Sequence, residues 1–239
     1  MPSGEEPPLE TVNRLAAIIK ELRRSILWLC LAVACASVAF YTVSPALLAL
    51  FQDHLDQDLA FFTVTGPFLS LVKLSLAMAL FTLMPLIIFF LWRALARPFQ
   101  LGRASIFWFV FFTCLLFYAG TAFCYFITLP YGVDFLLGFQ SEQLRPVISI
   151  NRFVTFVAVF ILAFGLIFEL PIFMVFLART GVLPRAVFEE NRRYAVLAIS
   201  IVAALLTPTP DVVNMMLMGV PLYLLYEAGI VVLKMLKVK

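Results

Sequence analysis

Three ionisable side chains interrupt long apolar stretches of this sequence, and they are the residues from which chemistry could start. Lys73, Glu169 and Glu227 each stand in a segment that otherwise carries no charge. Glu169 lies about 15 Å along a helix from the next charge, Arg179, and Glu227 lies about 10 Å from Lys234. A charged side chain costs about 2.5–3.5 kcal/mol at the centre of a membrane helix. Each glutamate therefore predicts a polar partner or a function. Lys73 lies about 30 Å along the helix from Arg93, so its ammonium group is expected to reach the membrane interface at the other end of that helix.

The remaining residues do not form the motifs of the common classes of catalytic site. The single histidine, His54, excludes His-rich metal sites, and the four cysteines lie in apolar runs without Cys-x-x-Cys spacing. The chain has no Gly-x-Ser-x-Gly, His-Glu-x-x-His or glycine-rich phosphate loop. We therefore predict no enzyme, no metal and no cofactor. The basic residues indicate nothing beyond the usual charge at membrane helix ends, so nucleic-acid binding is not expected.

The composition indicates the environment that surrounds these residues. Of 239 residues, 64% are hydrophobic and 13% charged, and the mean hydropathy is +1.05. Soluble domains are about 45–50% apolar and about 25% charged. The composition therefore excludes a soluble globular domain and favours a chain surrounded by lipid.

Uncharged stretches divide the chain into six membrane spans. About 20 apolar residues form one helical span, and the runs are too long for the strands of a membrane barrel. We predict one all-α membrane domain over residues 1–239, without a detectable internal repeat. The predicted spans are residues 25–45, 67–92, 104–130, 152–179, 194–206 and 212–233.

The charges between the spans predict the orientation. With six spans both termini share one side, and that side holds fourteen of the seventeen Lys and Arg residues with six carboxylates. The opposite loops hold only Arg145 and Arg152, with six carboxylates. By the positive-inside rule, both termini are cytoplasmic.

Several motifs, in order and at the expected depth, resemble the TatC family, the multispanning receptor of the twin-arginine protein translocase. The resemblance covers about residues 15–236. It is carried by Lys20-Glu21-Leu22-Arg23-Arg24, Phe164-Gly165-x-x-Phe168-Glu169-Leu170-Pro171, Thr207-Pro208-x-Pro210-Asp211 and Pro221-x-Tyr223-x-x-Tyr226-Glu227.

The resemblance implies a concave, glove-like arrangement of the six helices in the plasma (inner) membrane of a prokaryote. It implies a receptor for twin-arginine signal peptides of folded proteins, which recruits single-span TatA/TatB-like partners for export driven by the proton-motive force. A homo-oligomer is a further possibility under the same resemblance. Glu21 and Arg23 would bind the signal peptide. The residues implied in partner binding or translocation are Pro45, Tyr125, Glu169, Asp211 and Glu227.

One segment departs from the family pattern. The first cytoplasmic loop of the family usually reads Trp-x-Phe-x-x-Pro followed by an acidic residue. Here Trp92 is followed by Ala94 at the Phe position, and the loop contains Arg93, Arg97 and Arg103 without a carboxylate. Because like charges repel, we predict weak binding of paired arginines that depends mainly on Glu21. The alternative function is a small-solute or proton-coupled transporter that uses the buried Glu169.

Overall fold

The computed structural model describes residues 26–55, 59–60, 65–137, 148–206 and 212–236. Within these ranges the chain is helical apart from turns and one pair of two-residue strands, β1 (Leu59–Ala60) and β2 (Ile148–Ser149). The strands pair in parallel, and Leu59 lies opposite Ile148. The predicted all-α fold class is confirmed.

Each of the six predicted spans coincides with a helix or with consecutive helices. The first described helix covers Ile26–Tyr41. The others are α2 (Ser44–Leu55), α3 (Gly66–Ala96), α4 (Arg103–Phe123), α5 (Leu129–Leu137), α6 (Ile150–Ile167), α7 (Leu170–Arg179), α8 (Arg185–Glu190), α9 (Arg192–Leu206) and α10 (Val212–Met235). A π-helical turn, η1 (Cys124–Thr128), joins α4 to α5.

Only some of these helices, alone or joined end to end, are long enough to cross a bilayer. Among the described residues, four stretches qualify by length and composition, and a pair bent by 70° could form a fifth span. The four are Gly66–Ala96, Arg103–Val133, Ile150–Arg179 and Met218–Met235, and the bent pair is Ile26–Tyr41 with Ser44–Leu50. The remaining predicted span, α9, has only 15 residues, or about 22 Å of helix against a hydrocarbon core of about 30 Å.

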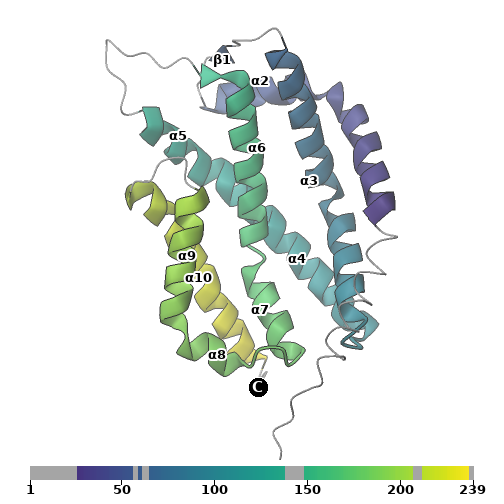
Figure 1. The fold of residues 1–239 in the computed structure, drawn as a ribbon, viewed down its shortest axis with the longest axis vertical. Helices are drawn as coiled ribbons and strands as arrows, with labels where there is room; N and C mark the ends of the chain where they lie inside the picture. Colours follow the sequence, from purple (N-terminus) through teal and green to yellow (C-terminus); the bar gives the residue numbers. More distant parts are fainter. Residues whose placement is uncertain (1–25, 56–58, 61–64, 138–147, 207–211, 237–239) are drawn as a thin grey trace, which may run out of the picture.

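Figure 1 shows how the helices are arranged. The first helix, α3 and the α6–α7 pair run along the long axis, and α4 crosses them obliquely. The helices α9 and α10 lie beside α7 and extend over only part of the length of α6–α7. The short elements α2 and β1 lie at one end of the molecule, and α8 lies at the other.

Two glycines allow α4 and α6 to approach each other closely. A Cβ atom on Gly120 would lie 2.6 Å from Cγ of Phe168, and one on Gly165 would lie 2.5 Å from Cε2 of Phe117. Phe117 and Phe164 are both completely buried at this crossing. Any larger residue at either glycine would force the helices apart, which typically costs about 1–3 kcal/mol.

Prolines explain where the long helices break or widen. A proline ring crowds the carbonyl four residues earlier and supplies no backbone N–H. Pro171 therefore places the end of α6 at Ile167, and Phe168 and Glu169 form a turn before α7. Pro130 follows η1, whose wider turn accommodates the proline within a continuous helical path.

The end of the first span differs from the prediction. The helix ends at Tyr41 rather than at Pro45, and the side chain of Ser44 donates a hydrogen bond to the Tyr41 carbonyl at 2.8 Å. Pro45 is the second residue of α2. Proline suits the first turn of a helix, where its missing N–H would have no partner, so Pro45 starts the next helix instead of closing the first.

Candidate functional site

Glu169 occupies the break between α6 and α7. Both of its carboxylate oxygens are buried, and neither has a hydrogen-bond partner among the described residues. Its polar neighbour is Thr113 on α4. The Thr113 oxygen accepts a hydrogen bond from the indole nitrogen of Trp92 at 3.0 Å, which leaves the hydroxyl proton free to turn toward a carboxylate. The buried carboxylate of Glu169 therefore has no polar neighbour named in the described chain other than the Thr113 hydroxyl.

Glu227 has a different environment on α10. Its Oε1 accepts a hydrogen bond from the Tyr223 hydroxyl at 3.0 Å and lies 3.3 Å from Nε of Arg192. The Glu227 side chain is 27% exposed, so the pair is partly solvated. These contacts join α10 to the first residue of α9, and Glu227 therefore has a structural explanation.

The same end of the molecule contains a second set of ion pairs. Oε1 of Glu189 on α8 lies 3.2 Å from Nε of Arg185 and 3.5 Å from Nζ of Lys234 on α10. The Tyr226 hydroxyl donates a hydrogen bond to the Phe188 carbonyl at 2.5 Å. Together these contacts attach the short helix α8 to the end of α10.

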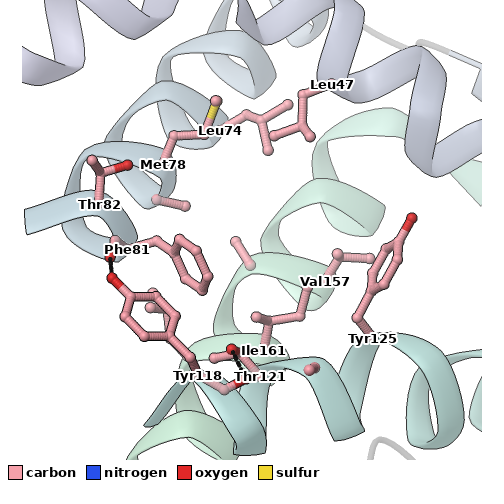
Figure 2. A pocket seen from close by; sticks show the side chains of 14 residues that line it. Leu47, Leu74, Met78, Phe81, Thr82, Tyr118, Thr121, Tyr125, Val157 and Ile161 are labelled. Atoms are coloured by element: carbon pink, nitrogen blue, oxygen red, sulfur yellow. Dashed lines mark hydrogen bonds between the residues drawn. The ribbon is translucent and has the colours of Figure 1, made fainter. Parts of the chain in front are cut away.

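An apolar groove of about 510 Å³ opens between α2, α3, α4, η1 and α6 (Figure 2). Its lining residues are Leu47, Leu74, Ala77, Met78, Phe81, Thr82, Tyr118, Thr121, Ala122, Tyr125, Val157, Ala158, Ile161 and Leu162. The Tyr118 hydroxyl donates to the Phe81 carbonyl at 3.1 Å, and the Thr121 hydroxyl donates to the Tyr118 carbonyl at 3.0 Å. Because this lining contains no carboxylate, Lys, Arg or His, the groove suits an apolar segment rather than a hydrated ion.

The groove and Glu169 lie close together along α4. Phe168, the residue before Glu169, packs against Gly120 of α4, which adjoins the groove residue Thr121.

The structure separates the residues that the sequence suggested as a set. Tyr125 projects toward the groove from η1 (Figure 2), and α2, which begins with Ser44 and Pro45, supplies the groove residue Leu47. Glu227 is paired with Tyr223 and Arg192, whereas Glu169 lies beside Thr113, so the two glutamates do not share a site. The remaining three predicted residues, Glu21, Arg23 and Asp211, lie outside the described residues.

Sequence reasoning missed two polar contacts between helices. The Lys73 ammonium on α3 donates to Asn151 Oδ1 at 2.7 Å and to Thr155 Oγ1 at 2.9 Å, so α6 binds it directly. The spacing of Asn151 and Thr155, four residues apart at the start of a span, was a usable signal. The placement of Thr113 beside Glu169 had no such signal, since it depends on how α4 packs against α7.

These features define a class of protein: a multispanning, helical membrane protein with an open apolar groove and, within the part of the chain that the structure describes, a buried carboxylate without a hydrogen-bond partner. The family model for the Sec-independent protein translocase protein TatC matches residues 17–221. The chain therefore belongs to the TatC family, and it is an inner-membrane component of the twin-arginine protein translocase.

Individual relatives agree with this assignment. The TatC protein of Koribacter versatilis is 32% identical over 222 residues, which cover 89% of this chain and 82% of the relative. The TatC protein of Carboxydothermus hydrogenoformans is 31% identical and covers 98% of this chain and 97% of the relative. A crystal structure of the twin-arginine translocase receptor TatC in DDM matches with a TM-score of 0.79 at 27% identity, over 90% of this chain and 98% of that chain.

Proposed function

We propose that this chain is the receptor subunit of its translocase. It binds twin-arginine signal peptides of folded proteins on the cytoplasmic side and recruits single-span TatA/TatB-like partners. Both termini are cytoplasmic in this proposal, and the proton-motive force drives export without a catalytic step in this chain. The supporting observation is the buried carboxylate of Glu169, which has no hydrogen-bond partner in the described chain and follows Phe168, a residue packed on α4 next to the apolar groove.

The groove and the carboxylate match the chemistry of a hydrophobic helix with a polar group. An apolar segment can replace lipid in the groove, and a donor on that segment can satisfy the carboxylate, which is otherwise costly at this depth. The alternative, a small-solute or proton-coupled transporter, would require a polar path. The groove lining supplies none, so the described residues favour the receptor.

Signal-peptide recognition depends on a different region in this proposal. Glu21 precedes the first described helix, and a carboxylate is the natural partner of a guanidinium group. Because the loop with Arg93, Arg97 and Arg103, predicted on the same side of the membrane, is basic, we expect weak binding that depends on Glu21. Crosslinking of a twin-arginine signal peptide should fall at least fivefold in Glu21→Ala, and normal crosslinking in that variant would contradict this assignment.

Complementation tests the function as a whole. A strain that lacks its translocase receptor should export a twin-arginine reporter when it receives this gene together with its single-span partners. The Glu169→Gln variant should fail at equal protein level, and Glu227→Gln should succeed. Export by Glu169→Gln at the wild-type rate would remove the main support for the proposal. Fluorescent labelling of a cysteine added after Lys239, from the cytoplasmic side only, would test the orientation.

A further inference from the structure

A lysine stands at the end of the apolar groove where α3 and α6 begin, close to α2 and β1 (Figure 1). Lys73 on α3 lies one turn before the groove residue Ala77, so both project from the same face of the helix. On α6, Thr155 precedes the groove residue Ala158 by three residues. The Lys73 ammonium donates to Thr155 Oγ1 at 2.9 Å and to Asn151 Oδ1 at 2.7 Å. The ammonium group therefore joins the two helices that form opposite walls of the groove.

The positive charge of Lys73 is hydrogen-bonded but not neutralised within the described part of the chain. Asn151 and Thr155 are uncharged, and the ion pairs among the described residues do not include Lys73. An ammonium group has three donors, and these two contacts use two of them. Arg152 is exposed in the first turn of α6, three residues before Thr155, and adds a second positive charge nearby. The described residues at this end of the groove are therefore suited to a further, anionic acceptor.

Lys73 lies at the depth of lipid headgroups. The side chain is exposed, and it lies about 30 Å along α3 from Arg93 in the last turn of that helix. The hydrocarbon core of a bilayer is also about 30 Å thick. The groove continues from Lys73 toward the bilayer centre, since its residues on α3 run from Leu74 to Thr82, or about 12 Å of helix. The positive charge is therefore at the boundary of the hydrocarbon, and the groove is inside it.

The lining and the size of the groove suit one acyl chain. The hydroxyl groups in the lining belong to Thr82, Tyr118, Thr121 and Tyr125. Those of Tyr118 and Thr121 donate to backbone carbonyls of the chain itself. The volume of about 510 Å³ lies within the range of about 300–1,000 Å³ that is typical of pockets for a single ligand. A matching occupant is apolar along its length and carries its polar group at the end where the ammonium group lies.

We propose that the groove binds one anionic phospholipid, with an acyl chain between α3 and α6 and the phosphate at Lys73. The phosphate oxygens accept a charge-assisted hydrogen bond from the ammonium group, and the chain covers the apolar walls. Charge complementarity selects the occupant, since a zwitterionic headgroup would bring its own cation toward Lys73 and Arg152. The proposal goes beyond the receptor function and does not depend on it, because it concerns this chain and its lipid alone.

Native mass spectrometry tests the headgroup contact. The full chain is freed of lipid in detergent and titrated with an equal mixture of phosphatidylglycerol and phosphatidylcholine that carry the same acyl chains. The first lipid bound should be phosphatidylglycerol. Lys73→Gln should lower this preference about fivefold, since a basic residue near an anionic lipid surface contributes about 1 kcal/mol. Lys73→Arg should keep the preference, and Arg193→Gln, which removes an exposed charge from the start of α9, should change it less than about twofold.

A pair of adjacent residues on α6 tests the chain contact. Ala158→Phe places a ring in the groove and should weaken the binding of both lipids about fivefold or more, because the acyl chain loses apolar contacts. Val159 is 58% exposed and is not among the lining residues, so Val159→Phe should leave both affinities within about twofold. If Ala158→Phe does not fold, Ala77→Leu narrows the groove from α3 and should weaken both lipids in the same way.

Three outcomes would overturn the proposal. An unchanged preference in Lys73→Gln, or an equal loss in Arg193→Gln, would show that the ammonium group does not hold the headgroup. Unchanged binding in the variants that narrow the groove would place the lipid elsewhere. Displacement of the lipid by excess glycerol phosphate would show that a free anion suffices. All these measurements use the chain without partners or signal peptide, so their failure is distinct from a failure of complementation.

Discussion

The two glutamates in the spanning helices differ in what the fold provides for them. Glu227 receives a hydroxyl and a guanidinium group within 3.3 Å and is partly solvated. Glu169 stands in a helix break, and its buried carboxylate has no hydrogen-bond partner in the described chain. The same residue type therefore has two environments: Glu227 joins two helices, whereas the Glu169 carboxylate lacks a hydrogen-bond partner in the described chain, as our proposal of an outside partner requires. Sequence position and hydrophobic surroundings alone did not separate these roles.

The largest effect should come from removing the available acid. Glu169→Ala should lower co-purification of the single-span partners at least tenfold, because a polar contact in the membrane loses its acceptor. Its thermal stability in detergent should stay close to that of the wild type, since the carboxylate has no hydrogen-bond partner in the described chain and only Thr113 as a polar neighbour. Glu227→Ala is the matched control and should retain the partners. Wild-type recovery of partners by Glu169→Ala would contradict the comparison.

A smaller effect should come from the neighbour of that acid. Thr113→Val keeps the shape of the side chain but removes the acceptor of the Trp92 indole hydrogen bond. A buried donor without a partner costs about 1–3 kcal/mol, so the melting temperature should fall. Trp92→Phe combined with Thr113→Val removes both polar groups and should recover part of the loss. A melting temperature that is unchanged in Thr113→Val would show that this contact does not support the site.

The smallest effect should come from the paired acid. The side chains of Arg192 and Glu227 are 46% and 27% exposed, and exposed ion pairs contribute about 0.2–1 kcal/mol. A double-mutant cycle of Arg192→Gln and Glu227→Gln, followed by thermal unfolding, should give a coupling energy in this range. A coupling energy above about 2 kcal/mol would mean that the Arg192–Glu227 pair behaves as a buried ion pair. The contrast between a partly solvated Glu227 and a buried Glu169 carboxylate would then be contradicted.

Much of the fold was predictable because apolar runs and prolines act locally. The spans follow from uncharged stretches, and the break at Glu169 follows from Pro171, which crowds the carbonyl of Ile167. The end of the first helix was placed four residues too late. Proline is compatible with the start of a helix as well as with its end, so Pro45 alone did not decide between the two.

The partners within the site could not be predicted in the same way. Arg192 meets Glu227 across 35 residues of sequence, and Lys73 meets Asn151 across 78. Such contacts depend on which faces of two helices oppose each other. The groove has the same origin, since its lining comes from five helical segments and contains only side chains that also suit a lipid-facing surface. The depth of Glu169 was predictable, whereas its lack of a partner required the fold.

The shortness of α9 has a consequence for biosynthesis. Its 15 residues provide about 22 Å of helix, which is less than a bilayer core requires, so α9 is a poor substrate for insertion by itself. The contact between Arg192 and Glu227 joins its first residue to α10. We expect the two helices to enter the membrane together as a hairpin, after α10 has emerged from the ribosome. A chain truncated between them should therefore leave its last segment on the side of synthesis, accessible to protease.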